Sequence, residues 1–183
     1  MRWFLLALAL ALALPPAHAD EALWDALRGG GHVLYVRHSQ TTPGIGDPPE
    51  FKLEQCTTQR NLSEEGRAQA RRMGEALRLR KVPIGEVLSS PWCRCVDTAQ
   101  LAFGRAKVWT PLSNLHARHE SADQQVRALR PRIAAHKGDR NLVLVAHGSV
   151  ASALIGEHPA MGEILVLKPQ PTGFRVVGRL ALP

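Results

Sequence analysis

The sequence predicts an α/β fold in which strands and helices alternate along a single domain. Two apolar runs, residues 31–36 and 141–146, have the length and content of buried strands. Amphipathic segments with helical spacing alternate with these and with shorter apolar runs, which is typical of the α/β class. The length of 183 residues, with 45% apolar and 21% charged residues, suits one domain with one core.

The first residues have the organisation of an export signal. Arg2 supplies a positive charge, residues 3–14 are apolar and uncharged, and Ala17-His18-Ala19 offers a small-x-small cleavage pattern. The apolar run is shorter than the ~20 residues that span a bilayer, which favours a signal peptide over a membrane anchor. We therefore expect a signal peptide at residues 1–19, a domain at residues 20–183 without a transmembrane segment, and a periplasmic or secreted protein.

The expected domain begins with a short amphipathic helix and the first strand. Alanine and leucine recur on one side of residues 20–28, and three consecutive glycines then end the helix. The strand covers residues 32–37. Residues 41–59 are rich in proline and glycine and indicate a loop, and loops of this length are usually functional or disordered.

The next helix has clear boundaries. Ser63 is a suitable N-cap, and Glu64 and Glu65 fall in the first turn, where carboxylates interact favourably with the helix dipole. Apolar and small residues then follow at spacings of three and four: Leu62, Gly66, Ala70, Met73 and Leu77. Pro83 lies beyond the end of the helix.

The remaining elements continue the alternation of strands and helices. We expect, in chain order, a strand at 86–89, a helix at 94–103, a strand at 107–110, a helix within 122–136, a strand at 141–146 and a helix at 150–155. Gly104 marks the end of the first of these helices. Two closing strands, at 163–168 and 174–180, flank a Pro/Gly turn and predict a hairpin.

The chain is basic, with a formal net charge of +7, and a basic surface attracts anions in general. Nucleic acid, an anionic envelope surface and a phosphorylated substrate would all fit. The basic residues are most concentrated in residues 67–81, which is more typical of one solvated helix face. With four Trp, one Tyr and four Phe, the chain has few platforms for base stacking, so we do not expect nucleic-acid binding.

Three cysteines predict one disulfide and one remaining thiol in an exported protein. Cys93 and Cys95 are too close in sequence for an ordinary bridge with each other. Cys56 would therefore pair with one of them, and we favour Cys93. A metal site is not expected, because the chain has no CxxC spacing and few histidines near the cysteines.

Polar side chains follow both long apolar runs. Arg37, His38 and Ser39 come after the first, and His147 comes after the second. Open α/β sheets bind ligands at the carboxyl ends of their strands, so two strands of one sheet could deliver these side chains to one cleft. Two histidines and an arginine suit chemistry on a phosphate group.

Four segments within residues 32–148 carry a family resemblance: Leu34-Tyr35-Val36-Arg37-His38-Ser39, Asn61-Leu62-Ser63-Glu64-Glu65-Gly66-Arg67-Ala68-Gln69-Ala70, Ser89-Ser90-Pro91 with Arg94, Asp97, Thr98 and Ala99, and Val143-Leu144-Val145-Ala146-His147-Gly148. In content and order they resemble the histidine phosphatase superfamily, the phosphoglycerate-mutase-like group. Glu163-Ile164 and Pro171-Thr172-Gly173 are also similar. The resemblance implies a three-layer α/β/α fold with a central, mostly parallel mixed sheet.

The resemblance also implies a reaction and residues for it. A histidine can attack phosphorus and form a covalent intermediate, and the matching residue is His38. Arg37 and Arg94 would bind phosphate oxygens in a forked geometry that lysine does not reproduce. His147, if protonated, would add a donor and a positive charge. No metal and no other cofactor is implied, because two arginines and a histidine replace the cation.

The chain departs from the family pattern in two places. Ser39 stands where the family usually has glycine, and its small hydroxyl could donate to the phosphate. Gln40, Thr41 and Arg60 are further candidate contacts, although solvated loop residues are the simpler interpretation for each of them. The usual acidic residue that protonates the leaving oxygen is also missing from its pattern. Glu120 is the nearest carboxylate, although a residue at a helix start is the simpler interpretation, and His116 and His119 are alternatives.

Export disfavours a glycolytic mutase and a cytoplasmic phosphohistidine phosphatase. The expected function is therefore a metal-independent phosphatase that acts on a small-molecule or envelope phosphate monoester, such as a phosphorylated lipopolysaccharide sugar. The alternative is a non-catalytic phosphate-binding or envelope interaction domain on the same fold.

Overall fold

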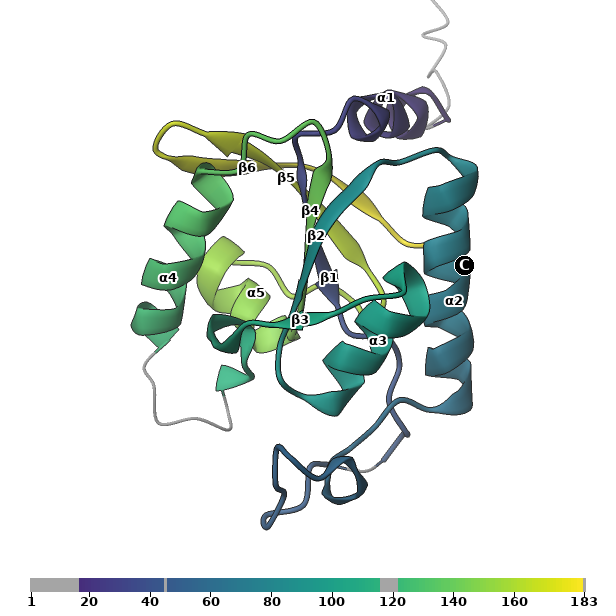
Figure 1. Cartoon of the computed structure of the whole chain (residues 1–183), viewed down its shortest axis with the longest axis vertical. Helices are drawn as coiled ribbons and strands as arrows, with labels where there is room; N and C mark the ends of the chain where they lie inside the picture. The colour runs from purple at the N-terminus through teal and green to yellow at the C-terminus, as the bar shows by residue number, and fades with distance from the viewer. Residues whose placement is uncertain (1–16, 45, 116–121, 183) are drawn as a thin grey trace, which may run out of the picture.

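A central six-stranded sheet with helices on both faces organises the computed structural model, which describes residues 17–44, 46–115 and 122–182 (Figure 1). The strands are β1 (Val33–Arg37), β2 (Ile84–Ser89), β3 (Lys107–Val108), β4 (Asn141–Ala146), β5 (Ile164–Gln170) and β6 (Gly173–Leu180). Their order across the sheet is β3-β2-β4-β1-β5-β6. The pairs from β3 to β1 are parallel, whereas β5 and β6 add an antiparallel hairpin. The predicted three-layer fold with a mostly parallel mixed sheet is confirmed.

The helices are divided between the two faces of the sheet. The described residues form α1 (Ala17–Arg28), α2 (Glu64–Leu79), α3 (Cys93–Phe103), α4 (Ala122–Ala134) and α5 (Gly148–Ile155), with 3-10 turns η1 (Cys56–Thr58) and η2 (Thr110–Leu112). Helices α1, α2 and α3 cover one face, and α4 and α5 cover the other (Figure 1).

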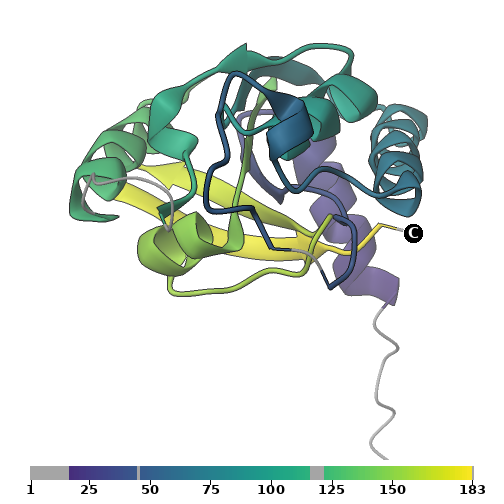
Figure 2. The same cartoon turned by 90° about the horizontal axis from the view of Figure 1, so that it is seen from below.

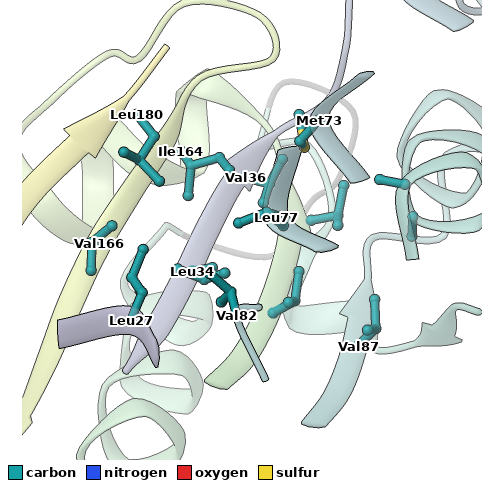
Figure 3. Packing of buried hydrophobic residues seen from close by; sticks show 14 of the residues in the cluster. Leu27, Leu34, Val36, Met73, Leu77, Val82, Val87, Ile164, Val166 and Leu180 are labelled. Atoms are coloured by element: carbon teal, nitrogen blue, oxygen red, sulfur yellow. The ribbon is translucent and has the colours of Figure 1, made fainter. Parts of the chain in front are cut away.

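Alternation along β1 explains the two layers of core. Leu34 and Val36 lie on the face that contacts α2, where they join a buried cluster with Leu77 (Figure 3). Val33 and Tyr35 point to the opposite face and belong to the second cluster. Because successive side chains of a strand point to opposite faces, a run of consecutive apolar residues marks a strand that is buried on both sides.

The boundaries of α2 follow from its first residues. The Ser63 hydroxyl accepts a hydrogen bond from the Gly66 amide at 3.0 Å and so caps the helix as predicted. Glu64 and Glu65 lie in the first turn. The buried side of the helix carries the predicted stripe, and Met73 and Leu77 are its largest members.

Five predicted boundaries were wrong by two residues or more. Strand β2 begins at Ile84 rather than at residue 86, and β5 extends to Gln170 rather than to residue 168. Helix α1 begins at Ala17 rather than at residue 20, so the expected cleavage site lies within its first turn. Strand β3 ends at Val108, because Thr110 already belongs to η2 and Pro111 has no N–H to donate to a neighbouring strand. Helix α5 begins at Gly148, directly after His147, and not at residue 150. Within the described segments, no helix has the length and apolar character needed to cross a membrane.

Candidate active site

His38 and His147 emerge side by side at the carboxyl edge of the sheet. Arg37 and Ala146, the last residues of β1 and β4, are paired in the parallel register, and each histidine follows directly. The His38 amide donates to the Ala146 carbonyl at 3.0 Å. The two imidazole rings are 5.4 Å apart between centroids, at an angle of 65°. Figure 2 looks onto this edge from below.

His38 is held as a neutral imidazole with one nitrogen available. Its side chain is 3% exposed, and Nδ1 lies 2.9 Å from the Ser39 carbonyl oxygen. A carbonyl can only accept, so Nδ1 carries the proton and Nε2 keeps its lone pair. Burial, reinforced by the positive charge of Arg94, lowers the pKa of His38 to about 3. The ring is therefore uncharged at neutral pH, with a proton on Nδ1 and a lone pair on Nε2 that can act as a nucleophile.

His147 is also neutral in this environment, which differs from the charged form considered from sequence. Burial is the main cause of a pKa well below the ordinary value, with further lowering from His38 and Arg94. Its Nε2 lies 2.9 Å from the Ser90 hydroxyl and 3.5 Å from the Cys95 thiol. The Ser90 hydroxyl can donate its proton to Nε2, which favours the tautomer with its proton on Nδ1, whereas the Cys95 thiol donates to the Ala146 carbonyl at 3.6 Å. His147 then offers an N–H donor rather than a full charge.

Arg37 is the last residue of β1 and is half-buried. One end of its guanidinium is fixed, since Nη1 donates to the Pro159 carbonyl at 2.7 Å. Its Nε is buried and has no hydrogen-bond partner among the described residues. Burial and the neighbouring charges of Arg60 and Arg94 lower the pKa of Arg37 from its ordinary value.

Arg94 lies in the first turn of α3 and is 1% exposed. Its Nη1 donates to the Asp47 carboxylate at 2.9 Å and to the Arg60 carbonyl at 3.3 Å. Its guanidinium carbon lies 4.4 Å from the centroid of the Trp92 ring, within cation–π distance. As with Arg37, Nε is buried without a partner in the described part of the chain.

The remaining predicted phosphate contacts differ in position. Ser39 is fully buried; its amide donates to the Thr98 hydroxyl, and its own hydroxyl has no partner within the described segments. The Gln40 side chain is exposed, and its backbone bonds to α2. Thr41 is buried, and its hydroxyl is 3.7 Å from the Met161 sulfur. Roles for these residues in phosphate binding stay predictions.

A disulfide ties the long loop to α3. It joins Cys56 to Cys93 with Cα atoms 5.6 Å apart, which is the pairing we favoured, and Cys95 remains a buried thiol. Gln59 supports the bridge, because its Oε1 accepts from the Cys93 amide at 3.0 Å and its Nε2 donates to carbonyls of the same loop. The loop is therefore anchored at the residue that precedes Arg94.

Sequence reasoning missed three residues of this site. Asp47 pairs with Arg94, Ser90 contacts His147, and Trp92 lies beneath the Arg94 guanidinium. Ser90 was visible only as part of a motif that carried the resemblance. An aspartate beside two prolines in a loop gives no local signal of a contact with a residue 47 positions away.

The candidate general acid cannot be placed beside these residues. Glu120, His116 and His119 all lie outside the described residues. Across residues 17–44, 46–115 and 122–182, no group of three or more His, Cys, Asp or Glu side chains could hold a metal ion.

The arrangement can bind a tetrahedral anion and attack it. Three donors at the strand ends lack partners among the residues that the structure describes: Arg37 Nε, Arg94 Nε and Ser39 Oγ. Buried donors without partners are costly in a folded protein, so their clustering indicates a ligand that accepts hydrogen bonds. The neutral Nε2 of His38 keeps a lone pair that can act as a nucleophile in the same site.

A comparison with family models matches the part of the chain that carries His38 and both arginines. Residues 33–121 match the model of the histidine phosphatase superfamily (branch 1). That range includes β1 with Arg37 and His38, and α3 with Arg94. No curated protein sequence is similar enough to count as a match.

Solved structures share the fold at low sequence identity. SixA from Agrobacterium tumefaciens is 22% identical, with a TM-score of 0.57 over 82% of this chain and 98% of that protein. A mycobacterial glucosyl-3-phosphoglycerate phosphatase in complex with VO3 is 22% identical, with a TM-score of 0.61 over 80% and 97%. The protein histidine phosphatase SixA with tungstate is 15% identical, with a TM-score of 0.60 over 82% and 96%.

Proposed function

Because the chain belongs to the histidine phosphatase superfamily, we propose that it hydrolyses phosphate monoesters through a phosphohistidine intermediate on His38. One observation carries the proposal. His38 is a buried, neutral imidazole with its Nε2 lone pair available, beside two arginines that each keep a buried Nε without a partner in the described structure. A nucleophile and an anion site thus occupy the same strand ends.

In the first step, Nε2 of His38 attacks phosphorus and the bond to the ester oxygen breaks. Arg37 and Arg94 bind non-bridging oxygens and balance their spreading negative charge. The Nδ1–H of His147 supplies a further donor. The leaving oxygen takes a proton from an acid or from water, and the phosphoryl group is then bonded to His38.

In the second step, a water oxygen attacks phosphorus and the P–N bond breaks. The water gives up a proton, and inorganic phosphate leaves with His38 neutral again. Glu120 stays our candidate for the group that protonates the leaving oxygen and then activates this water. Loss of such an acid costs ~10²–10⁴ in rate, and less for leaving groups of low pKa.

Metal independence is part of the proposal and rests on the charges in the site. Arg37 and Arg94 offer the positive charge that a divalent cation supplies in many phosphatases. Hydrolysis in the presence of EDTA should therefore equal hydrolysis without it. Full loss of activity in EDTA, with recovery on adding a divalent metal, would contradict this part of the proposal.

Export to an oxidising compartment is also proposed, with a small-molecule or envelope phosphate monoester as substrate. The disulfide between Cys56 and Cys93 supports it, because such bonds persist mainly outside the cytosol. Protein isolated from the producing cells should begin at Asp20 and lie in the periplasmic or secreted fraction. Cytoplasmic protein that begins at Met1 would contradict export.

A second candidate function is phosphate binding without catalysis. The ion pair between Arg94 and Asp47 favours it, because the carboxylate reduces the net positive charge available to a transition state while the Nε–H donor of Arg94 remains for a bound phosphate. This reading predicts phosphate affinity without turnover.

Hydrolysis of p-nitrophenyl phosphate by the purified protein separates the two functions. We expect turnover that falls ~10³-fold or more in His38→Ala, with inorganic phosphate or vanadate still bound. Rapid quenching should trap a phosphoenzyme that is labile in acid and stable in alkali. His136→Ala is the matched control, because His136 is only partly buried and its side chain bonds to the Arg140 carbonyl, away from His38 and His147. Binding of vanadate without turnover would move the conclusion to the binding domain.

A further inference from the structure

We propose that Asp47 is a positioning residue for Arg94, which it holds so that the Nε and Nη2 edge of the guanidinium faces the phosphoryl group. The inference rests on the proposed function only in requiring that the site takes a phosphate group. It applies equally to a catalytic site and to a binding site.

The bonds of Arg94 assign one edge of its guanidinium to the protein. Nη1 donates to the Asp47 carboxylate and to the Arg60 carbonyl, whereas Nε has no partner within the described residues. In any guanidinium, the Nε–H bond and Nη2 lie on the same edge, and this edge can bind two oxygens of one phosphate. Asp47 occupies the nitrogen that does not belong to that edge.

Arg37 is tethered in the same way by a different part of the chain. Its Nη1 donates to the Pro159 carbonyl, and its Nε is likewise buried without a partner among the described side chains and backbone. Both predicted phosphate ligands are thus fixed through Nη1, and each keeps an Nε without a partner in the part of the chain that the structure describes. The repetition supports a role for the tether in presenting the Nε edge.

Asp47 is itself held in place by its loop. The oxygen that accepts from Arg94 also accepts from the Arg60 amide at 3.0 Å. Arg60 follows Gln59, whose side chain bonds to the Cys93 amide, and the disulfide links the same loop to α3. The loop that carries Asp47 and the helix that carries Arg94 are therefore joined, close to the ion pair, by a hydrogen bond and a disulfide.

A contrary interpretation makes Asp47 a competitor that phosphate must displace. The geometry argues against it, because the carboxylate and a phosphate would use different edges of the same guanidinium. Burial adds a second argument. Arg94 is 1% exposed, and a buried cation without a carboxylate is unstable in place, so removal of Asp47 should let the side chain reorient.

The decisive experiment is a double-mutant cycle on phosphate binding by the full chain. Dissociation constants for vanadate and inorganic phosphate are measured by calorimetry for wild type, Asp47→Ala, Arg94→Lys and the double variant. We expect Asp47→Ala to weaken binding by at least about tenfold when Arg94 is present. In the Arg94→Lys background, we expect the same change to have less than about a twofold effect.

The sign of the effect separates the two interpretations. Loss of a negative charge alone would tighten the binding of an anion, so weaker binding indicates lost orientation. Tighter binding of vanadate by Asp47→Ala would overturn the proposal in favour of a competitor. Equal weakening in both backgrounds would overturn it as well, because it would show a general structural effect.

Two further variants protect the test against a folding defect. Asp47→Asn keeps an oxygen that can accept from Arg94 and the Arg60 amide, and we expect an affinity between those of wild type and Asp47→Ala. Asp97→Asn is the matched control, since Asp97 lies on the same helix as Arg94 but pairs with Arg67, at 3.1 Å. Its affinity for vanadate should equal that of wild type. Wild-type vanadate binding without turnover would reject the phosphatase and leave this test intact.

Discussion

The α-carbon of Gly66 lies against the carbonyl of Gln40, and a Cβ at position 66 would stand 1.8 Å from that oxygen. The same carbonyl accepts from the Ser63 amide at 3.1 Å. The first turn of α2 is thus packed onto the backbone two residues beyond His38. A side chain at Gly66 would push this backbone away from the site.

Gly66→Ala should lower the free energy of unfolding by about 1–3 kcal/mol, because the backbone must shift to admit a methyl group. Urea denaturation measures the change. Gly46→Ala is the control, since no atom of the described residues lies within 4 Å of a Cβ built there, and its effect should stay below about 0.5 kcal/mol. Equal effects of the two substitutions would contradict the close contact.

The His38 ring should remain neutral throughout the physiological pH range. Its pKa is lowered to about 3 by burial and by Arg94, so its ring resonances in nuclear magnetic resonance spectra should not move between pH 8 and pH 5. The His38→Ala spectrum identifies which resonances belong to this ring. A titration with a midpoint near pH 6.5 would show an exposed ring and contradict the structure.

The free energy of unfolding should depend on pH through the His38 imidazole. The unfolded chain protonates this histidine near pH 6.5, whereas the folded site resists protonation until about pH 3. Below pH 6.5 the unfolded state binds more protons, so the free energy of unfolding falls as the pH is lowered from about 6.5 toward about 3. His38→Asn should show a shallower decline over this window. A slope equal to that of wild type would argue against a buried neutral ring.

Arg37→Lys keeps the positive charge but loses the forked donor edge. We expect kcat/KM for an aryl phosphate to fall by roughly 10–100-fold, the cost of a charge-assisted hydrogen bond. Arg67→Lys is the control, because Arg67 pairs with Asp97 where both side chains are one-third exposed. That variant should change kcat/KM by less than about twofold. A similar effect of both variants would exclude a forked contact at Arg37.

The disulfide should contribute to stability as a constraint on the unfolded chain. The cysteines are 37 positions apart, and their joint replacement by serine should lower the free energy of unfolding by about 2–4 kcal/mol. Wild type treated with reductant should match the Cys56→Ser/Cys93→Ser variant in chemical denaturation. Three titratable thiols in untreated, denatured protein would show that the bond is missing.

Sequence was most informative where local pattern and tertiary position coincide. β1 and β4 are buried on both faces, so their apolar runs show directly in the sequence, and the residues that follow must lie at the sheet edge. Ser63 marked the start of α2 because capping is a local interaction. The Cys56–Cys93 pairing was favoured because so few pairings were open.

Contacts between distant segments were beyond the reach of sequence. The partner of Arg37 is the carbonyl of Pro159, 122 positions away, and a backbone oxygen has no sequence signature. The charge of His147 was left conditional because its pKa depends on complete burial and on His38 and Arg94. Local sequence propensity carries no information about the backbone partner of Arg37 or about the burial of His147.

Asn141 attaches helix α1 to the amino end of β4, the strand whose carboxyl end carries His147. Its side chain bonds to the Leu27 carbonyl of α1 at the start of β4, whereas His147 follows the end of the same strand. The strand has six residues, Asn141 included, which is roughly 20 Å of extended chain. Helix α1 and the site thus lie at opposite edges of the sheet (Figure 1). If the domain were attached to a surface through α1, His38 and His147 would face away from that surface, toward ligands in solution.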